Sequence, residues 1–208
     1  MFFRITPVVK NLIILNAVMF VGALMLAKSN ISINLAMFSP VIDTLLPDYD
    51  LFKPYQLITS VFSHANFKHL LFNMVSLFFL GSMLEERIDS KSFGIIYLAS
   101  AFGGIVINEL INFLIISGSL NLKPSGWVLG ASGAVSGIIA ALATFSPNQQ
   151  IQLLFPPIPL KLKWLAIIFI ALDLRGGMSG VSDGIAHWVH IGGALTGFLM
   201  MKFWYLRR

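Results

Sequence analysis

Ser132 and His190 are the residues whose types and setting could carry out covalent chemistry. Ser132 lies in the segment Gly130-Ala131-Ser132-Gly133, and His190 begins the later segment His190-x-x-Gly193-x-x-x-Gly197. A serine hydroxyl is a poor nucleophile until a base such as imidazole takes its proton. Both segments are apolar enough to cross a membrane, so the pair suggests hydrolysis of a peptide bond inside a bilayer.

The tetrahedral intermediate of such a reaction needs hydrogen-bond donors aimed at its oxyanion. The backbone N–H of Ser132, the Asn73 amide and the His69 ring are suitable donors. No acidic residue stands at an obvious position for a third catalytic group, so we predict a Ser–His dyad. The chemistry requires neither a cofactor nor a metal.

The composition places the chain in a membrane. Of its 208 residues, 57% are hydrophobic and only 11% are charged, whereas a soluble domain carries about 25% charged residues. A chain of this length forms one compact domain. We therefore expect an all-α membrane protein whose single domain covers residues 1–208, with lipid as its solvent.

Six apolar segments are candidates for transmembrane helices, which need roughly 20 residues each. The fifth is the shortest of the six. The predicted spans are residues 11–27, 67–84, 93–117, 127–146, 159–174 and 184–205.

The positive charges predict the orientation of these spans and do not indicate nucleic acid as a partner. With six spans and an inner N-terminus, nine Lys and Arg fall on the inner side and five on the outer, together all fourteen. Cytoplasmic loops carry such an excess. We expect a multi-pass protein of a bacterial inner membrane, with both termini in the cytoplasm and the site opening to the outer side.

The candidate site residues share a depth in the membrane. With a helical rise of about 1.5 Å per residue, Ser132 and His190 lie roughly 10 Å below the outer surface. His69 lies about 3 Å and Asn73 about 9 Å below it. All four therefore fall in the outer leaflet, on three different spans.

Glycines follow the same helix faces as the site residues. Gly130, Gly133 and Gly137 accompany Ser132, and Gly193 and Gly197 accompany His190. In lipid, helix association depends on close packing, which small residues permit. We predict that spans four and six approach closely enough to bring Ser132 Oγ within about 2.6–3.2 Å of a His190 ring nitrogen.

Three connecting segments carry predictions of their own. Residues 29–66 form a long outer connection with its own apolar residues, which we expect to pack on the outer face or to dip into the membrane interface. The segment Pro156-Pro157-Ile158-Pro159 cannot be helical throughout and marks an inner turn. Residues 176–180, Gly-Gly-Met-Ser-Gly, are typical of a mobile outer loop, a candidate lid beside His190.

The chain resembles the rhomboid family of intramembrane serine proteases. Gly130-Ala131-Ser132-Gly133 matches the family's G-x-S-G, and His190-x-x-Gly193-x-x-x-Gly197 matches its sixth-span motif. A third match, His64-x-x-x-x-His69-x-x-x-Asn73, lies on the second span. The resemblance runs from about residue 55 to residue 205.

That resemblance implies roles for the matched residues. Ser132 is then the nucleophile, His190 the base, and His69 and Asn73 oxyanion donors. It also implies a six-helix bundle, and single-pass membrane proteins as substrates, which enter sideways past span five and are cut at a locally unstable segment after a small residue.

The sequence departs from the family at two places. Tyr55-Gln56 stands where rhomboids often carry Trp-Arg, which puts the anchoring of the outer loop in question. Ser136 replaces an aromatic residue that stacks on the histidine in some members. The family's glutamate near the inner end of span two is matched by Glu85 or Glu86.

Other interpretations of these residues remain open. His187 and His190 are spaced as metal ligands could be, but a zinc site needs further ligands. His64 is interpreted as a structural or loop-contacting residue and His187 as a near-surface residue of the cavity. Glu109 is interpreted as hydrogen-bonded to Asn108, Asn112 or loop backbone, with a part in substrate entry as the alternative. A transporter would predict inverted repeats, and none is present. The second function is a catalytically silent relative that binds membrane clients.

Overall fold

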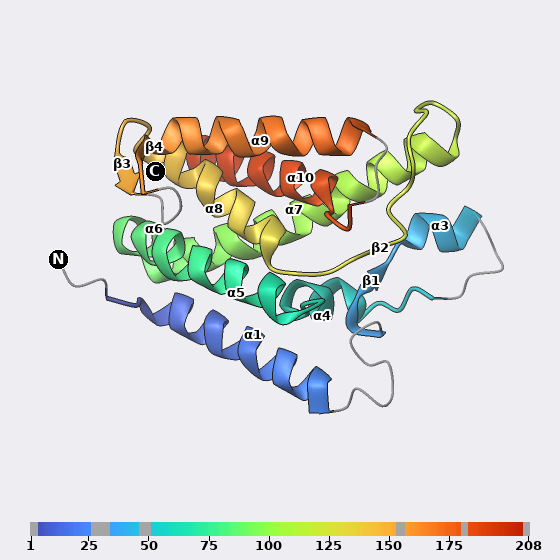
Figure 1. The fold of residues 1–208 in the computed structure, drawn as a ribbon, viewed down its shortest axis with the longest axis horizontal. Helices are drawn as coiled ribbons and strands as arrows, with labels where there is room; N and C mark the ends of the chain where they lie inside the picture. Colours follow the sequence, from blue (N-terminus) through green and yellow to red (C-terminus); the bar gives the residue numbers. More distant parts are fainter. Residues whose placement is uncertain (1–3, 26–33, 46–50, 153–156, 180–182, 206–208) are drawn as a thin grey trace.

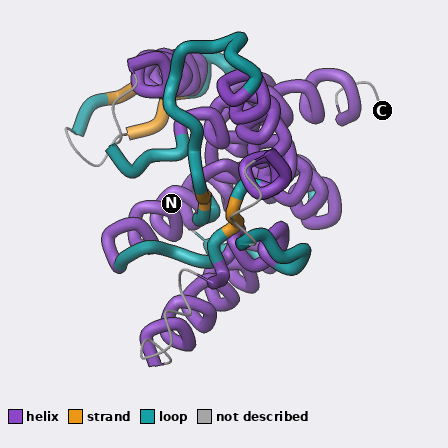
Figure 2. The backbone as a smooth tube through the Cα atoms, turned by 90° about the vertical axis from the view of Figure 1, so that its right-hand side faces the viewer, coloured by secondary structure: helices purple, strands orange, loops and turns teal. Residues whose placement is uncertain are grey.

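The computed structural model describes residues 4–25, 34–45, 51–152, 157–179 and 183–205 of the chain. Helices dominate this part of the protein, and two short pairs of antiparallel strands complete it (Figures 1 and 2). The helical segments are α1 (Pro7–Met25), α3 (Pro40–Leu45), α4 (Gln56–Phe62), α5 (Phe67–Ser76), η2 (Leu77–Gly81), α6 (Ser82–Ile88), α7 (Ser90–Ile116), α8 (Ser132–Phe145), α9 (Leu162–Ser179), α10 (His187–Leu199) and η3 (Met200–Tyr205). The strands are β1 (Met37–Phe38), β2 (Trp127–Val128), β3 (Gln150–Gln152) and β4 (Pro159–Lys161).

Each of the six predicted spans coincides with a helical segment, although several boundaries differ. The second span is one rod formed by α5, η2 and α6, and the sixth joins α10 to η3. By length and composition, α1, residues 67–88 and α7 could cross a membrane, and α8 is a shorter apolar helix. The helical membrane fold is therefore confirmed, whereas the count of six crossings stays a prediction.

The predicted outer loop at residues 176–180 is mostly wrong, because α9 continues as a helix to Ser179. Gly180 lies outside the described residues. The prediction for span four also began too early, since residues 127–128 form β2 and the helix starts at Ser132. These two differences matter because they set which side chains of α8 and α9 face His190.

Helices α7, α8 and α10 form the tightly packed centre of the bundle. A Cβ on Gly104 of α7 would lie 2.5 Å from the carbonyl oxygen of Val189, and one on Gly192 of α10 would lie 2.7 Å from that of Gly103. Neither position leaves room for a side chain. The backbones of α7 and α10 are therefore in direct contact. Such close packing is what holds helices together in lipid, because lipid supplies no hydrophobic drive for their association.

The outer connection packs on the bundle as predicted, through short elements and buried hydrogen bonds. Strand β1 pairs with β2, so residues 37–38 are tied to the segment that leads into α8. Glu109 of α7 accepts hydrogen bonds from Asn108 and Asn112, at 3.0 and 3.2 Å, and from the hydroxyl of Ser39. The expected structural role of Glu109 is thus confirmed, with Ser39 of the loop as an additional partner.

Gln56 anchors the same loop, which answers the question raised by its Tyr-Gln dipeptide. Its side chain is buried, and Oε1 accepts a hydrogen bond from the Lys53 N–H at 3.0 Å. Its Nε2 donates to the carbonyls of Asn34 and Leu51 at 3.2 and 3.3 Å. One amide therefore ties together three points of the loop.

Glu85 secures the end of the bundle at which α1 begins. Its carboxylate accepts hydrogen bonds from the backbone N–H groups of Val8 and Val9, both at 3.0 Å, and from the Thr6 hydroxyl at 2.5 Å. The first N–H groups of a helix have no partner within the helix. Glu85 supplies that partner for α1, and it also binds the Ser90 hydroxyl at the start of α7.

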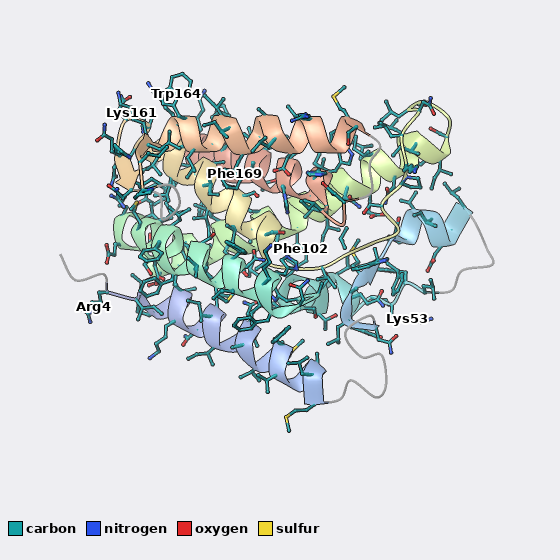
Figure 3. All side chains as sticks on the ribbon, viewed as in Figure 1. Arg4, Lys53, Phe102, Lys161, Trp164 and Phe169 are labelled. Atoms are coloured by element: carbon teal, nitrogen blue, oxygen red, sulfur yellow. The ribbon has the colours of Figure 1, made fainter. Side chains whose placement is uncertain are left out.

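The two ends of the bundle differ in what they carry. Both ends of the chain lie with α6 and the β3–β4 hairpin, while β1, β2 and α3 lie at the opposite end (Figure 1). Arg4 and Lys161 lie at the first end and Lys53 at the second (Figure 3). The predicted inner turn around Pro156 falls partly outside the described residues, and β4 begins at Pro159, its final proline.

Candidate active site

Ser132 and His190 form a direct hydrogen bond. Ser132 is the first residue of α8 and His190 lies in the first turn of α10, and Oγ is 2.8 Å from Nε2. That distance lies within the range that nucleophile–base pairs adopt. Both residues are partly accessible, so a reacting group could reach the pair.

Glycines on α8 and α10 permit this contact. A Cβ on Gly193 would overlap the Gly133 carbonyl, and one on Gly197 would overlap the Gly137 carbonyl. The two glycine pairs are one helical turn apart, so the backbones stay in contact along the shared stripe. The first of these pairs joins the residue directly after Ser132 to the residue three positions after His190.

Gly130 shapes the approach to α8. Its φ of +116° is a conformation that residues with a side chain rarely adopt, and its N–H donates to the Ser60 carbonyl at 2.8 Å. The His69 ring lies against Gly130, where a Cβ would meet Cε1 at 2.6 Å. Glycine is required here on both grounds.

The start of α8 has no side-chain cap from its preceding residue, within the part of the chain that the structure describes. That residue is Ala131, and the first N–H groups of a helix have no acceptor within it. The N-terminus of a helix also attracts negative charge through its dipole. The Ser132 backbone N–H is therefore well suited to an oxyanion, and a capping side chain does not compete for it.

His69 and Asn73 lie on one face of α5. The Asn66 side chain caps this helix by accepting from the His69 N–H at 2.9 Å. Asn73 is buried, and its Nδ2 donates to the His69 carbonyl at 3.0 Å, which uses one of its two N–H bonds. The second N–H is the one that could serve an oxyanion.

Two small cavities flank the Ser132–His190 pair. One, of about 20 Å³ for the centres of water molecules, is lined by Ser132, Gly130, Gly133 and Ser60 with apolar neighbours. The other, of about 10 Å³, is lined by His190, Ser136 and Asp173 with apolar neighbours. A water needs roughly 10–15 Å³ measured this way, so each cavity has a volume close to that of one water.

Asp173 is the site residue that the sequence analysis missed. It lies on α9, is 8% exposed, and places Oδ1 at 3.0 Å from His190 Nδ1. The expectation that no acid stands near the pair was therefore wrong. A signal was available, since an acid within an apolar span usually has a function. It was lost because the predicted fifth span ended at residue 174, which left Asp173 at its edge.

His187 connects Asp173 to the outer surface. Its Nδ1 is 2.8 Å from Asp173 Oδ1, and its Nε2 is 3.2 Å from Oδ2 of Asp183. The Ile185 N–H donates to Asp183 at 3.0 Å and, with the nearby His187 ring, holds the pKa of that carboxyl below its usual range. His187 therefore does more than line a cavity.

His64 lies beside His69, just before α5. The two rings meet edge to face with centroids 5.0 Å apart, and His64 is only 4% exposed. Burial, and secondarily the neighbouring His69, lower the pKa of His64 to about 4, and the Phe62 carbonyl opposes this only in part. His64 is therefore a neutral, packed residue, which agrees with the structural role expected for it.

This pKa predicts that acid destabilises the protein through His64. The unfolded chain takes up the proton near pH 6.5, whereas the folded chain does so only near pH 4. Stability is therefore full above about pH 6.5 and falls as pH drops toward 4, by at most about 3 kcal/mol. The free energy of unfolding in mixed micelles, measured at pH 7.5 and 5, should fall more for the wild type than for His64→Gln. Equal falls would contradict the assignment.

Comparisons with known proteins identify the family of this domain. Residues 52–207 match the rhomboid domain. The chain is 31% identical over 153 residues to RHOMBOID-like protein 1 of Arabidopsis thaliana, covering 70% of this chain and 33% of that protein. It is 28% identical over 156 residues to Rhomboid protein 1, mitochondrial, of Saccharomyces cerevisiae, covering 73% and 42%. It is 28% identical over 151 residues to the mouse Presenilin-associated rhomboid-like protein, mitochondrial, covering 72% and 37%.

The chain spans a third to under half of the length of these relatives. The match nevertheless runs from the outer loop through α10, and so includes every residue of the candidate site. The chain belongs to the rhomboid family, whose domain is a helical membrane bundle.

Proposed function

We propose that the protein is an intramembrane serine endopeptidase that cleaves single-pass membrane proteins within or near their transmembrane segment. The observation that carries the proposal is the 2.8 Å hydrogen bond between Ser132 Oγ and His190 Nε2 at the N-terminus of α8. A nucleophile, a base and free backbone donors meet at one point. This is the set of groups that acyl transfer requires.

The reaction proceeds through an acyl-enzyme. Ser132 Oγ attacks the carbonyl carbon of the substrate while its proton passes to His190 Nε2. The C–N bond breaks as the imidazolium gives that proton to the leaving amine. Water then attacks the ester on Ser132 and gives a proton to His190, which returns it to Ser132 Oγ as the carboxylic acid leaves.

The negative oxygen of each tetrahedral intermediate needs hydrogen-bond donors. We assign this role to the Ser132 backbone N–H, to the free N–H of Asn73 and to the His69 ring. The uncapped start of α8 and the position of His69 against Gly130 support the assignment. Each such donor is worth about 10²–10³ in kcat.

The site faces the side of the membrane opposite the termini. We propose that the termini lie in the cytoplasm and the site opens outward, because the predicted inner side carries the excess of Lys and Arg. The membrane that we propose is a bacterial inner membrane. Relatives from yeast and mouse are named as mitochondrial, so the family also serves organelle membranes. Reporter fusions at the C-terminus test the orientation.

A catalytically silent, client-binding protein is the alternative function. The mouse relative is named for an association with presenilin, which favours membrane proteins as partners in either case. Labelling with a serine-reactive fluorophosphonate separates the two functions, because only an activated serine reacts.

The test compares purified wild type with Ser132→Ala and with Ser117→Ala, whose serine is exposed at the end of α7. We expect the wild type and Ser117→Ala to label and to cleave a single-span reporter, and Ser132→Ala to do neither. Labelling that survives in Ser132→Ala, or a wild type that neither labels nor cleaves, contradicts the proposal.

A further inference from the structure

Asp173 occupies a position that is unfavourable for an acid unless a function requires it. Its neighbours Leu172 and Leu174 are 58% and 40% exposed on a helix whose outer face is apolar, whereas Asp173 itself turns inward and is buried. A carboxylate at membrane depth is costly unless it is paired. Both of its recorded partners are histidine rings, and one of them is the proposed catalytic base.

The pattern of donors and acceptors around Asp173 fixes the tautomer of His190. An ionised carboxylate only accepts hydrogen bonds, so the Nδ1 of His190 must carry its proton toward Asp173. The Nε2 of that ring is then unprotonated and can accept from the Ser132 hydroxyl, 2.8 Å away. This is the tautomer that a general base needs.

His187 holds Asp173 in place from the other side. Its two ring nitrogens face the carboxylates of Asp173 and Asp183, at 2.8 and 3.2 Å. The side chains of His187 and Asp173 are only 10% and 12% exposed, while that of Asp183 is 42% exposed. A chain of hydrogen bonds thus runs from the outer surface to Ser132.

Small residues at the C-terminal end of α9 make room for the side chains of this hydrogen-bond series. Asp173, Gly176 and Gly177 lie at i, i+3 and i+4, which is one face of a helix. A Cβ on Gly176 would overlap the His187 ring, and one on Gly177 would lie 3.0 Å from the Trp188 ring. Gly176 and Gly177, which in the sequence resemble a loop, therefore provide the space that the His187 and Trp188 rings occupy at the start of α10.

We propose that Asp173 is a positioning residue that orients His190 and stabilises its imidazolium, and that His187, held by Asp183, keeps Asp173 in register. The inference rests on the proposed function, and it adds a third group to the expected dyad. It also assigns a role to Ser136. The small side chain at that position helps to line the cavity that Asp173 and His190 also line.

The first test is kinetic. Asp173→Asn keeps the shape of the side chain but removes its charge, and we expect kcat to fall about 10²–10⁴-fold with little change in KM. Gly176→Ala, which displaces the His187 ring, should lower kcat in the same direction. Glu86→Gln, an exposed carboxylate at the inner end, is the matched control and should keep the wild-type kcat.

The pH profile distinguishes positioning from a merely structural tie between α9 and α10. The charged or titratable groups against His190 are Asp173, His187 and His69, while α8 contributes the Ser132 hydroxyl and α7 packs through Gly103 and Gly104. Without the Asp173 charge the imidazolium loses its negative neighbour. The acid limb of kcat/KM should then move to lower pH by about one unit or more.

A third readout does not depend on activity. The chain has four histidines, so the ¹⁵N NMR signals of its rings can be assigned with His190→Gln as the reference. We expect His190 to be protonated at Nδ1 in the wild type and to lose this preference in Asp173→Asn. His187→Gln should weaken the preference without abolishing it.

These readouts separate the two proposals. An active wild type whose kcat, pH profile and His190 tautomer are all unchanged by Asp173→Asn overturns the positioning role and leaves the protease intact. An inactive wild type whose His190 tautomer still depends on Asp173 overturns the protease and leaves the positioning role intact. An inactive wild type whose tautomer ignores Asp173 overturns both.

Discussion

Replacing Ser132 or His190 with alanine is expected to lower kcat for a single-span reporter by about 10⁴–10⁶-fold. The two side chains share one proton across a 2.8 Å hydrogen bond, so each is ineffective without the other. The double variant should therefore be no slower than either single one. Stopped-time cleavage in proteoliposomes measures all three rates against the wild type.

The form of this result matters as much as its size. Losses that multiply in the double variant would mean that the two residues act independently, which contradicts a nucleophile–base pair. Folding is checked by comparing the thermal unfolding of each variant. We expect small changes there, because Ser132 and His190 are partly accessible and contribute little to the core.

Replacing Gly193 or Gly197 with alanine should both destabilise the protein and inactivate it. Each new methyl group would overlap a backbone carbonyl of α8, which cannot rotate away as a side chain could. Overpacking of this kind costs about 1–3 kcal/mol, and we expect values at the upper end of that range. A shift of α10 by about 1 Å would also lower kcat on the order of 10²-fold.

Gly94→Ala is the matched control for these variants. Gly94 lies within α7 and has open space where its Cβ would point. Alanine is favoured over glycine inside a helix by up to about 1 kcal/mol, so this variant should be as stable as the wild type or more so, with unchanged kcat. If Gly193→Ala and Gly197→Ala behave like Gly94→Ala, the close contact of α8 and α10 is contradicted.

The two glycine stripes and the Ser132–His190 pair could be predicted from the sequence for one physical reason. A membrane span is a helix of known rise and period, so residue spacing alone gives the depth of a residue and shows which residues share one helix face. Ser132 and His190 fall at one depth on helices whose small residues permit contact, and the structure brings them to 2.8 Å. Glu109 was placed with Asn108 and Asn112 by similar reasoning, since a membrane acid needs a nearby partner.

The beginning of α8 could not be read from periodicity. Trp127 and Val128 are as apolar as the helix that follows, yet they pair with Met37 and Phe38 of the distant outer connection. Only that long-range pairing, followed by the positive φ of Gly130, makes Ser132 the first residue of its helix. The free N–H of Ser132 is therefore a consequence of tertiary structure.

By itself, the sequence determined the membrane environment and the helical spans and singled out Ser132 and His190, because these depend on residue type and on spacing along one helix. Only the tertiary structure decided that α9 runs on through Gly176 and Gly177 and turns Asp173 toward His190. In a sequence, two adjacent glycines suggest the end of a helix. Within this packed bundle they instead leave space for the rings of His187 and Trp188. The rotation of a helix about its own axis follows from such contacts with its neighbours, and no local pattern in the sequence records it.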